Sequence, residues 1–152
     1  MRITEYRAWI ICQQRMVRVA GLEFGDSIRI EVPRIGKENT RGRAWGNPDN
    51  FEFWFEGTEA ILLQYTGLKD KNRKKMYDGD IIRRYVGAKF IGIALIVFGN
   101  HNVGKNGWGI HLNCQGFFEE WQDGSGYSAL DDGKDRRVIG NIYENPELLE
   151  KP

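Results

Sequence analysis

The sequence predicts a mainly β protein that folds as one compact domain. Its 152 residues are enough for one domain with its own core. Short β-branched and aromatic runs that alternate with polar residues are frequent, whereas apolar residues at helical spacing are scarce. The 19 glycines, with five Trp, six Tyr and eight Phe but only four prolines, favour short strands joined by tight turns. A small barrel or a strongly bent sheet is the expected architecture.

The overall charge excludes a protein that is basic over its whole surface. Lys and Arg number 22 and Asp and Glu number 21, which leaves a net charge of +1. A general polyanion binder is normally far more basic. Any nucleic-acid site must therefore be a local concentration of positive charge.

In the first half of the chain, alternation predicts each strand in turn. Residues 6–11 and 16–19 are short apolar runs joined by a polar turn. Residues 28–32 alternate apolar and polar side chains, as in a half-buried strand. Pro33 is expected to end that strand, because proline has no N–H to donate to a neighbouring strand. Residues 51–55 alternate again, with aromatic side chains on the apolar face.

A long loop is predicted over residues 34–50. This stretch holds three Gly, one Pro and three Asn, with few apolar residues. Loops of this length are commonly functional. Trp45 is expected to anchor the loop to the core; display to a partner is the alternative.

In the second half, turn residues separate the predicted strands. Residues 69–74 predict a hairpin turn, and Asp78-Gly79-Asp80 predicts a tight turn with glycine at positive φ. At the end of the chain, Asn145, Pro146 and Glu147 supply an N-cap, a first helical position and a first-turn acid, which predicts a short helix. The predicted strands are residues 61–65, 76–77, 81–86, 90–98, 108–112, 116–121 and 138–143.

A glycine-rich stretch at residues 99–106 approaches the pattern of a nucleotide-binding P-loop. Gly99, Gly104 and Lys105 have the required spacing. However, Asn106 replaces the Ser or Thr that would hold Mg²⁺, and no helix is predicted to follow and complete the phosphate site. A glycine-rich hairpin is the preferred interpretation.

Residues of catalytic or metal-binding type form no recognisable constellation. His101, His111 and Cys114, even with Cys12, match no common zinc spacing, and two histidines offer no relay to a nucleophile. We therefore expect no enzymatic activity, no cofactor and no metal. The adjacent acids are interpreted as solvated turn residues: Asp78 and Asp80, Glu119 and Glu120, Asp131 and Asp132.

Segments that would direct the chain out of the cytoplasm are not indicated. The first residues contain no apolar run of signal-peptide type. The longest apolar run, residues 90–99, is about half of what a bilayer span needs. Cys12 and Cys114 are far apart in sequence, so we expect two buried, reduced thiols rather than a disulfide.

Positive charge concentrates in residues 69–75, which hold five basic residues and one acid. A hairpin tip of this charge could contact phosphates, and nearby Tyr65, Tyr77 and Tyr85 could stack on bases. The alternative is a solvated turn whose lysines protect a strand edge from aggregation. The candidate binding residues are Lys69, Lys71, Arg73, Lys74, Lys75, Arg83 and Arg84.

Several blocks of the sequence resemble the YopX family of bacteriophage and prophage proteins. They are residues 63–72, 76–82 and 138–149, together with Tyr6-Arg7-Ala8-Trp9. The chain departs from the family pattern at Arg73, where members commonly have glycine after the asparagine. Since a non-glycine residue disfavours positive φ, we expect a turn of another type here.

The resemblance implies a phage or prophage origin, a small β-rich fold and a location in the bacterial cytoplasm. It implies no established activity and no catalytic residues. Residues 77–82 are similar to the start of a strand in an SH3-like barrel, and residues 138–142 to its closing strand. The interior Gly140 predicts a bulge or a close backbone approach.

Two functions follow as hypotheses. The first is a non-enzymatic phage accessory protein that binds a protein partner, including a second copy of itself. It rests on the many aromatics and strand edges and on the lack of a catalytic constellation. The alternative is a nucleic-acid-binding protein that uses the basic hairpin at residues 69–75.

Overall fold

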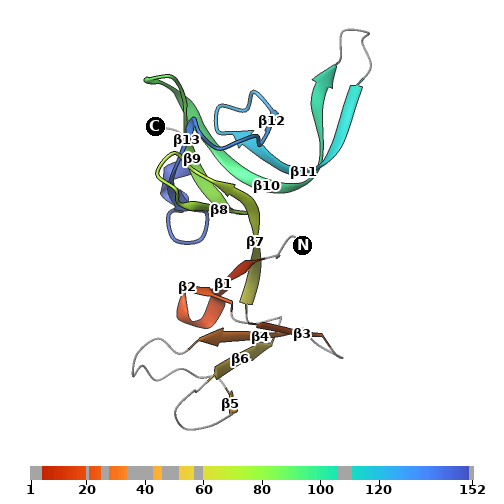
Figure 1. Ribbon diagram of the computed structural model, residues 1–152, viewed down its shortest axis with the longest axis vertical. Coiled ribbons are helices and arrows are strands. Elements are labelled where there is room, and N and C mark those ends of the chain that lie inside the picture. Colours follow the sequence, from red (N-terminus) through yellow and green to blue (C-terminus); the bar gives the residue numbers. More distant parts are fainter. Residues whose placement is uncertain are drawn as a thin grey trace. The chain divides into compact units, whose positions relative to one another are not determined.

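The fold comes from a computed structural model, which describes residues 5–19, 21–24, 28–33, 43–45, 52–56, 60–105 and 111–150 (Figure 1). The chain divides into two compact units, Met1–Gln64 and Tyr65–Pro152. Strand β7 (Ala60–Lys69) contains the boundary: its first half pairs with β1 and its second half with β8. The expectation from the sequence that residues 1–152 form a single domain stays a prediction.

The first unit is built from short antiparallel strands. Strand β1 pairs with β2 on one side and with β7 on the other, and a second sheet has the order β3-β4-β6-β5. The buried cluster of this unit consists of Ala8, Ile10, Val17 and Ala60. The elements are β1 (Tyr6–Ile10), the 3-10 helix η1 (Ile11–Gln13), β2 (Arg15–Arg18), β3 (Gly21–Phe24), β4 (Ile28–Pro33), β5 (Arg43–Trp45) and β6 (Glu52–Glu56).

The second unit is a five-stranded antiparallel sheet in the order β12-β11-β10-β9-β13. Its long strands β10 and β11 bend along their length, so the sheet curls into a half-barrel (Figure 1). The elements are β8 (Lys75–Tyr77), β9 (Asp80–Val86), β10 (Lys89–Lys105), β11 (His111–Trp121), β12 (Tyr127–Ala129), β13 (Arg136–Asn141) and the 3-10 helix η2 (Pro146–Leu149).

Side chains from one face of this curled sheet form its core. Alternate residues of β9, β10 and β13 point to the same side, because successive side chains of a strand face opposite ways. The buried cluster consists of Ile82, Ala94, Ile96 and Val138 of this sheet, together with Met76 of β8. On the opposite face, Ile81 is also buried, whereas Arg83 of β9 and Arg137 of β13 are exposed.

The predicted mainly β class, with a bent sheet and a short C-terminal helical turn, is confirmed. Gly140 also behaves as expected: the register shifts between Val138 and Gly140, and a Cβ there would lie 2.5 Å from Asn145 Oδ1. Asn145 is the N-cap residue of η2, followed by Pro146 and the first-turn acid Glu147 as predicted, although the Asn145 side chain makes no capping hydrogen bond.

Several boundaries differ from those predicted. Pro33 is the last residue of β4, paired with Glu52, since a strand end tolerates a missing N–H. Residues 116–121 and part of 108–112 form one strand, β11, and β10 continues to Lys105. Strands β3 and β12 were not predicted, and both are too short for alternation to identify.

The predicted loop at residues 34–50 is described only at β5, where Trp45 pairs with Glu52. The rest of that stretch lies outside the described residues. Among the described residues, the helical segments are single 3-10 turns, and none has the length and apolar character of a membrane span.

Candidate nucleic-acid interface

The turn between β7 and β8, residues 70–74, is organised by the buried carboxylate of Asp70. One oxygen, Oδ1, accepts hydrogen bonds from the backbone N–H of Asn72 at 2.8 Å and of Lys74 at 2.9 Å. The other, Oδ2, accepts one from the N–H of Val138 in β13 at 3.0 Å. Asp70 therefore fixes the turn on the edge of the curled sheet.

A second link holds the same turn to β13. The N–H of Lys71 donates to the carbonyl oxygen of Arg136 at 3.0 Å. Together with the Asp70 bonds, it satisfies backbone groups on an outer edge of the sheet that would otherwise be open to pairing. We call residues 70–74 the basic turn.

The basic turn keeps a left-handed residue although glycine is absent. Arg73 has φ of 64°, so the expected turn of another type is wrong. The bonds from Asp70 hold the conformation that a glycine would adopt without strain.

Replacing Arg73 with Gly should raise the free energy of unfolding by about 0.5–1 kcal/mol. The left-handed region costs a non-glycine residue about 1–2 kcal/mol of stability, which glycine avoids. Glycine in turn lowers the stability by about 0.4–1 kcal/mol, because it raises the conformational entropy of the unfolded chain. Urea unfolding measures the difference. Arg73→Ala is the control, because it removes the same charge but keeps Cβ; equal stability of the two variants would contradict the strain.

Two pairs of arginines lie opposite each other on strands β9 and β13. The register pairs Arg83 with Arg137 and Arg84 with Arg136. Since neighbouring residues of a strand face opposite ways, one arginine of each strand points outward and one inward. We call Arg83 and Arg137 the outer arginine pair, and Arg84 and Arg136 the inner arginine pair.

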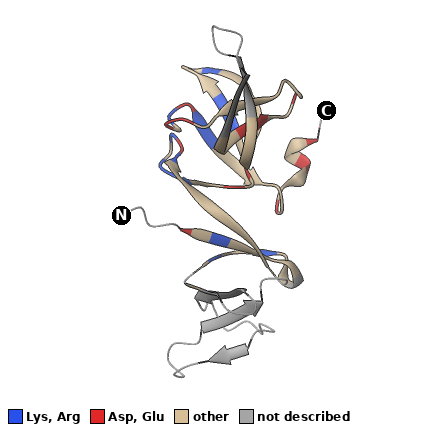
Figure 2. Cartoon of the chain, turned by 90° about the vertical axis from the view of Figure 1, so that its right-hand side faces the viewer, with Lys and Arg blue, Asp and Glu red and all other residues tan. Residues whose placement is uncertain are grey.

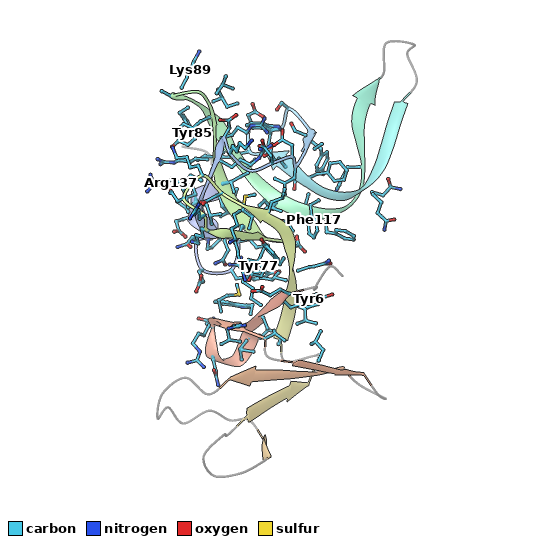
Figure 3. The ribbon with its side chains drawn as sticks, viewed as in Figure 1. Tyr6, Tyr77, Tyr85, Lys89, Phe117 and Arg137 are labelled. Carbon is cyan, nitrogen blue, oxygen red and sulfur yellow. The ribbon has the colours of Figure 1, made fainter. Side chains whose placement is uncertain are left out.

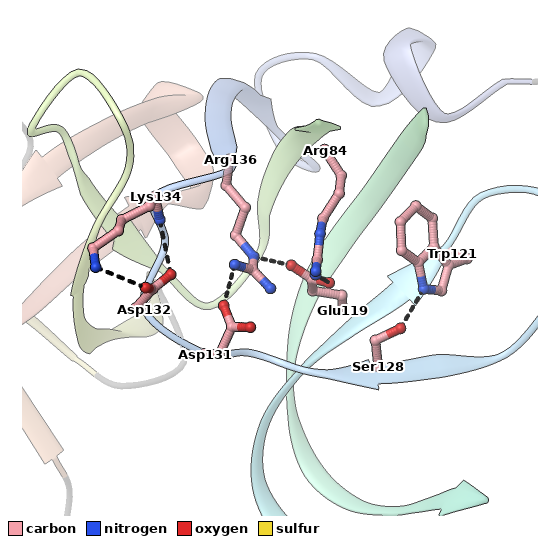
Figure 4. Close-up of polar contacts among 8 residues, drawn as sticks. All are labelled: Arg84, Glu119, Trp121, Ser128, Asp131, Asp132, Lys134 and Arg136. Atoms are coloured by element: carbon pink, nitrogen blue, oxygen red, sulfur yellow. Dashed lines mark hydrogen bonds and ion pairs between the residues drawn. The ribbon is translucent and has the colours of Figure 1, made fainter. Parts of the chain in front are cut away.

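The inner arginine pair shares one buried acid (Figure 4). Arg84 Nη1 donates to Glu119 Oε2 at 2.5 Å, and Arg136 Nε donates to Glu119 Oε1. The side chains of Glu119 and Arg136 are 0% and 1% exposed. Asp131, on the loop before β13, accepts a further hydrogen bond from Arg136 Nη1.

These partners keep Arg136 charged. Burial by itself lowers the pKa of the Arg136 guanidinium, but the hydrogen bonds and negative charges of Glu119 and Asp131 outweigh it and hold that pKa above its usual value. The inner arginine pair is thus a neutralised structural cluster inside the half-barrel.

Among the described residues, no acid forms an ion pair with the outer arginine pair. Both side chains are exposed, and like charges directly opposite on a sheet destabilise it. Figure 3 shows Arg137 on the same side of the unit as Tyr85 and Lys89. In the described part of the chain, these exposed cations of the region form no ion pair: Lys69, Lys71, Arg73, Lys74, Arg83 and Arg137.

Two aromatic rings in contact are flanked by two cations on this outer face. The ammonium of Lys71 lies 4.4 Å from the Tyr85 ring centroid, and the Arg83 guanidinium carbon lies 5.8 Å from that of Phe90. The two rings meet edge to face with their centroids 6.0 Å apart. We call Lys71, Tyr85, Phe90 and Arg83 the stacking row.

The predicted binding residues differ in exposure and direction. Lys69, Lys71, Arg73, Lys74 and Arg83 are exposed, and Figure 2 marks the basic positions of this unit in blue. Lys75 is half-buried, with its ammonium 5.4 Å from the Tyr65 ring centroid. Arg84, by contrast, points inward to Glu119, because it neighbours the outward-pointing Arg83 on the same strand.

Sequence reasoning missed three residues of this site. Arg137 lay before the predicted start of its strand, so its pairing with Arg83 could not be read without the register. Asp70 was counted only as the one acid of the basic stretch, although an Asp side chain in a turn commonly hydrogen-bonds the backbone two residues on. Phe90 was identified only as a strand residue.

Other candidate sites have structural explanations. Residues 99–105 lie in the extended strand β10 and form no phosphate-binding loop. Within the described ranges, no cluster of three or more His, Cys, Asp or Glu residues could hold a metal ion. The side chains of Cys12, His111 and Cys114 lie outside the described residues.

The acids that occur in pairs along the sequence have separate structural roles. Asp80 Oδ2 accepts the N–H of Tyr77 at 2.8 Å, and Glu119 binds the inner arginine pair. The backbone N–H and then the side chain of Lys134 hold the pKa of exposed Asp132 below its usual value. Burial and the nearby charge of Asp78 raise the pKa of Tyr143.

The fold and this surface define a class: a mainly β protein whose second unit is a curled antiparallel sheet with a basic outer face. The family model described as YopX protein matches residues 5–150. The chain therefore belongs to the YopX family, and the resemblance seen in its sequence is confirmed.

A solved structure has the same fold. The crystal structure of protein EF1440 from Enterococcus faecalis is similar with a TM-score of 0.60 and 24% sequence identity, over 99% of this chain and 100% of that chain. A search of the curated proteins gives no match.

Proposed function

We propose that the chain is a non-enzymatic phage or prophage accessory protein of the bacterial cytoplasm that binds nucleic acid through the outer face of its second unit. Its YopX membership supports the phage setting. The observation that carries the binding function is the outer arginine pair, an exposed pair of like charges without an acidic partner in the described structure. A polyanion would supply the missing negative charge.

The local charge supports the same proposal. Residues 69–90 contain eight Lys and Arg but only three Asp and no Glu. Two of those acids, Asp70 and Asp80, are buried and accept backbone N–H groups. Even with these acids counted, residues 69–90 carry an excess of positive charge.

Binding of oligonucleotides at low salt tests the proposal. We expect the full chain to shift the fluorescence anisotropy of labelled DNA or RNA, with an affinity that falls as salt rises. Replacing both members of the outer arginine pair with Gln should reduce the salt dependence, whereas Arg18→Gln, an exposed charge on β2 of the first unit, should not. Absence of binding at low ionic strength would contradict the proposal.

Protein binding is the second candidate. The hairpin joining β9 and β10 exposes three apolar side chains, Val86, Phe90 and Ile91, which a protein partner or a second copy could cover. Light scattering and a pulldown from host lysate separate this candidate from the first: a monomer that captures no protein excludes it.

A further inference from the structure

We propose that the ligand of the outer face is single-stranded nucleic acid, with unpaired bases stacked on Tyr85 and Phe90 of the stacking row. This inference rests on the proposed function and specifies its substrate. The lysines and arginines alone would serve any polyanion, including a duplex. The aromatic rings between them are what select unpaired bases.

The placement of Phe90 is the first observation. Its side chain is 51% exposed although phenylalanine is among the residues most often buried. It lies at the end of a hairpin, away from the buried cluster of the half-barrel. The core therefore does not explain an aromatic residue at this position.

A bulge in β10 puts Phe90 into the row. The register is regular where Arg83 pairs with Ile93 and Arg84 with Gly92. It shifts at the next position, so that Phe90 rather than Ile91 lies opposite Tyr85. A bulge redirects side chains in this way and is a common device beside binding sites. Here it brings the Phe90 ring onto the face that carries the outer arginine pair.

Each ring of the row has its own cation. Lys71 lies over Tyr85 and Arg83 lies by Phe90, at the distances given above. A base stacked on Phe90 would have the Arg83 charge near its phosphate, and a base that takes the place of the Lys71 ammonium over Tyr85 would leave that ammonium for its phosphate. In a duplex the faces of the bases are covered by their neighbours, so the rings would contribute nothing there.

Fluorescence anisotropy with three probes tests this assignment: oligothymidylate, oligouridylate and a mixed-sequence DNA duplex, each about 12 nucleotides or base pairs long. The full chain is titrated at about 50 mM salt, where phosphate contacts are strong. We expect tighter binding to the single strands than to the duplex.

The variants Tyr85→Leu and Phe90→Leu separate stacking from charge, because both keep every cation. Each should weaken single-strand binding by about tenfold and leave duplex binding unchanged. The control is Phe98→Leu: Phe98 is 49% exposed on the same strand but packs against Phe117, with centroids 5.0 Å apart, outside the row. Thermal unfolding of each variant verifies the fold.

The outcomes distinguish this inference from the function on which it rests. A duplex bound as tightly as the single strands, or Phe90→Leu binding like the unmodified chain, overturns the single-strand assignment but leaves nucleic-acid binding standing. Binding to none of the three probes at low salt overturns the proposed function as well. Capture of a protein through the same hairpin, with no oligonucleotide binding, assigns the face to a protein partner instead and overturns both.

Discussion

Glu119→Gln should lower the free energy of unfolding by about 3–5 kcal/mol, the usual cost of breaking a buried ion pair. Glu119 is fully buried and accepts hydrogen bonds from both members of the inner arginine pair. Removing its charge leaves two guanidinium groups of the half-barrel with no buried counter-charge, and only Arg136 retains another acid, Asp131. The loss is a large part of the stability of a domain of this size. The urea midpoint, followed by near-ultraviolet circular dichroism, measures it.

The neighbouring acid provides a matched control. Glu120 is the next residue of β11, on the opposite face, and its Oε1 accepts a 3.4 Å hydrogen bond from the Tyr127 hydroxyl. Glu120→Gln makes the same chemical change and should alter the free energy of unfolding by less than about 0.5 kcal/mol, as exposed surface substitutions usually do. Equal losses in the two variants would show that the inner cluster does not stabilise the fold.

Asp70→Asn should lower the free energy of unfolding by about 2–3 kcal/mol, because it leaves at least one buried backbone donor without an acceptor. The carboxylate accepts three backbone N–H groups, one of them from Val138 in another strand. An amide offers only one accepting oxygen, and its NH₂ group would meet a donor. The basic turn should also detach from β13, which hydrogen exchange at Val138 would report.

Asp123→Asn is the comparison for this variant. Asp123 is exposed and accepts the N–H of Ser125 at 2.8 Å, a local turn bond of the same kind. Its loss should cost far less, because solvent can replace the acceptor. If Asp70→Asn unfolds at the same urea concentration as Asp123→Asn, then the turn is not fixed through Asp70.

The fold class could be predicted because alternation and turn residues are local signals. They identify strands such as Ile28–Pro33 and Asp80–Val86 without knowledge of their partners. The short strands β3, β5 and β12 could not be predicted, because three or four residues show no period. Their pairing comes from contacts with longer neighbouring strands.

The candidate site was predicted in part, for a reason that lies in strand pairing. Composition alone reveals the basic stretch at residues 69–75 and the Arg83-Arg84 dipeptide. It does not reveal which arginine of that dipeptide points outward, or that Arg137 lies beside it. The left-handed Arg73 was mispredicted because the bonds that hold it come from a carboxylate whose burial depends on β13.

The central claim is that the fold uses the inner arginine pair for stability and leaves the outer arginine pair for a ligand. The double variant Arg83→Gln/Arg137→Gln tests it with two readouts on one sample, oligonucleotide anisotropy against salt and urea unfolding. We predict that the slope of log affinity against log salt becomes shallower by about 1.4–1.8, as for two lost phosphate contacts. The free energy of unfolding should stay the same or rise by about 0.2–1 kcal/mol, since an unfavourable cross-strand pair is removed. An unchanged salt slope, or a loss of stability like that of Glu119→Gln, would contradict the claim.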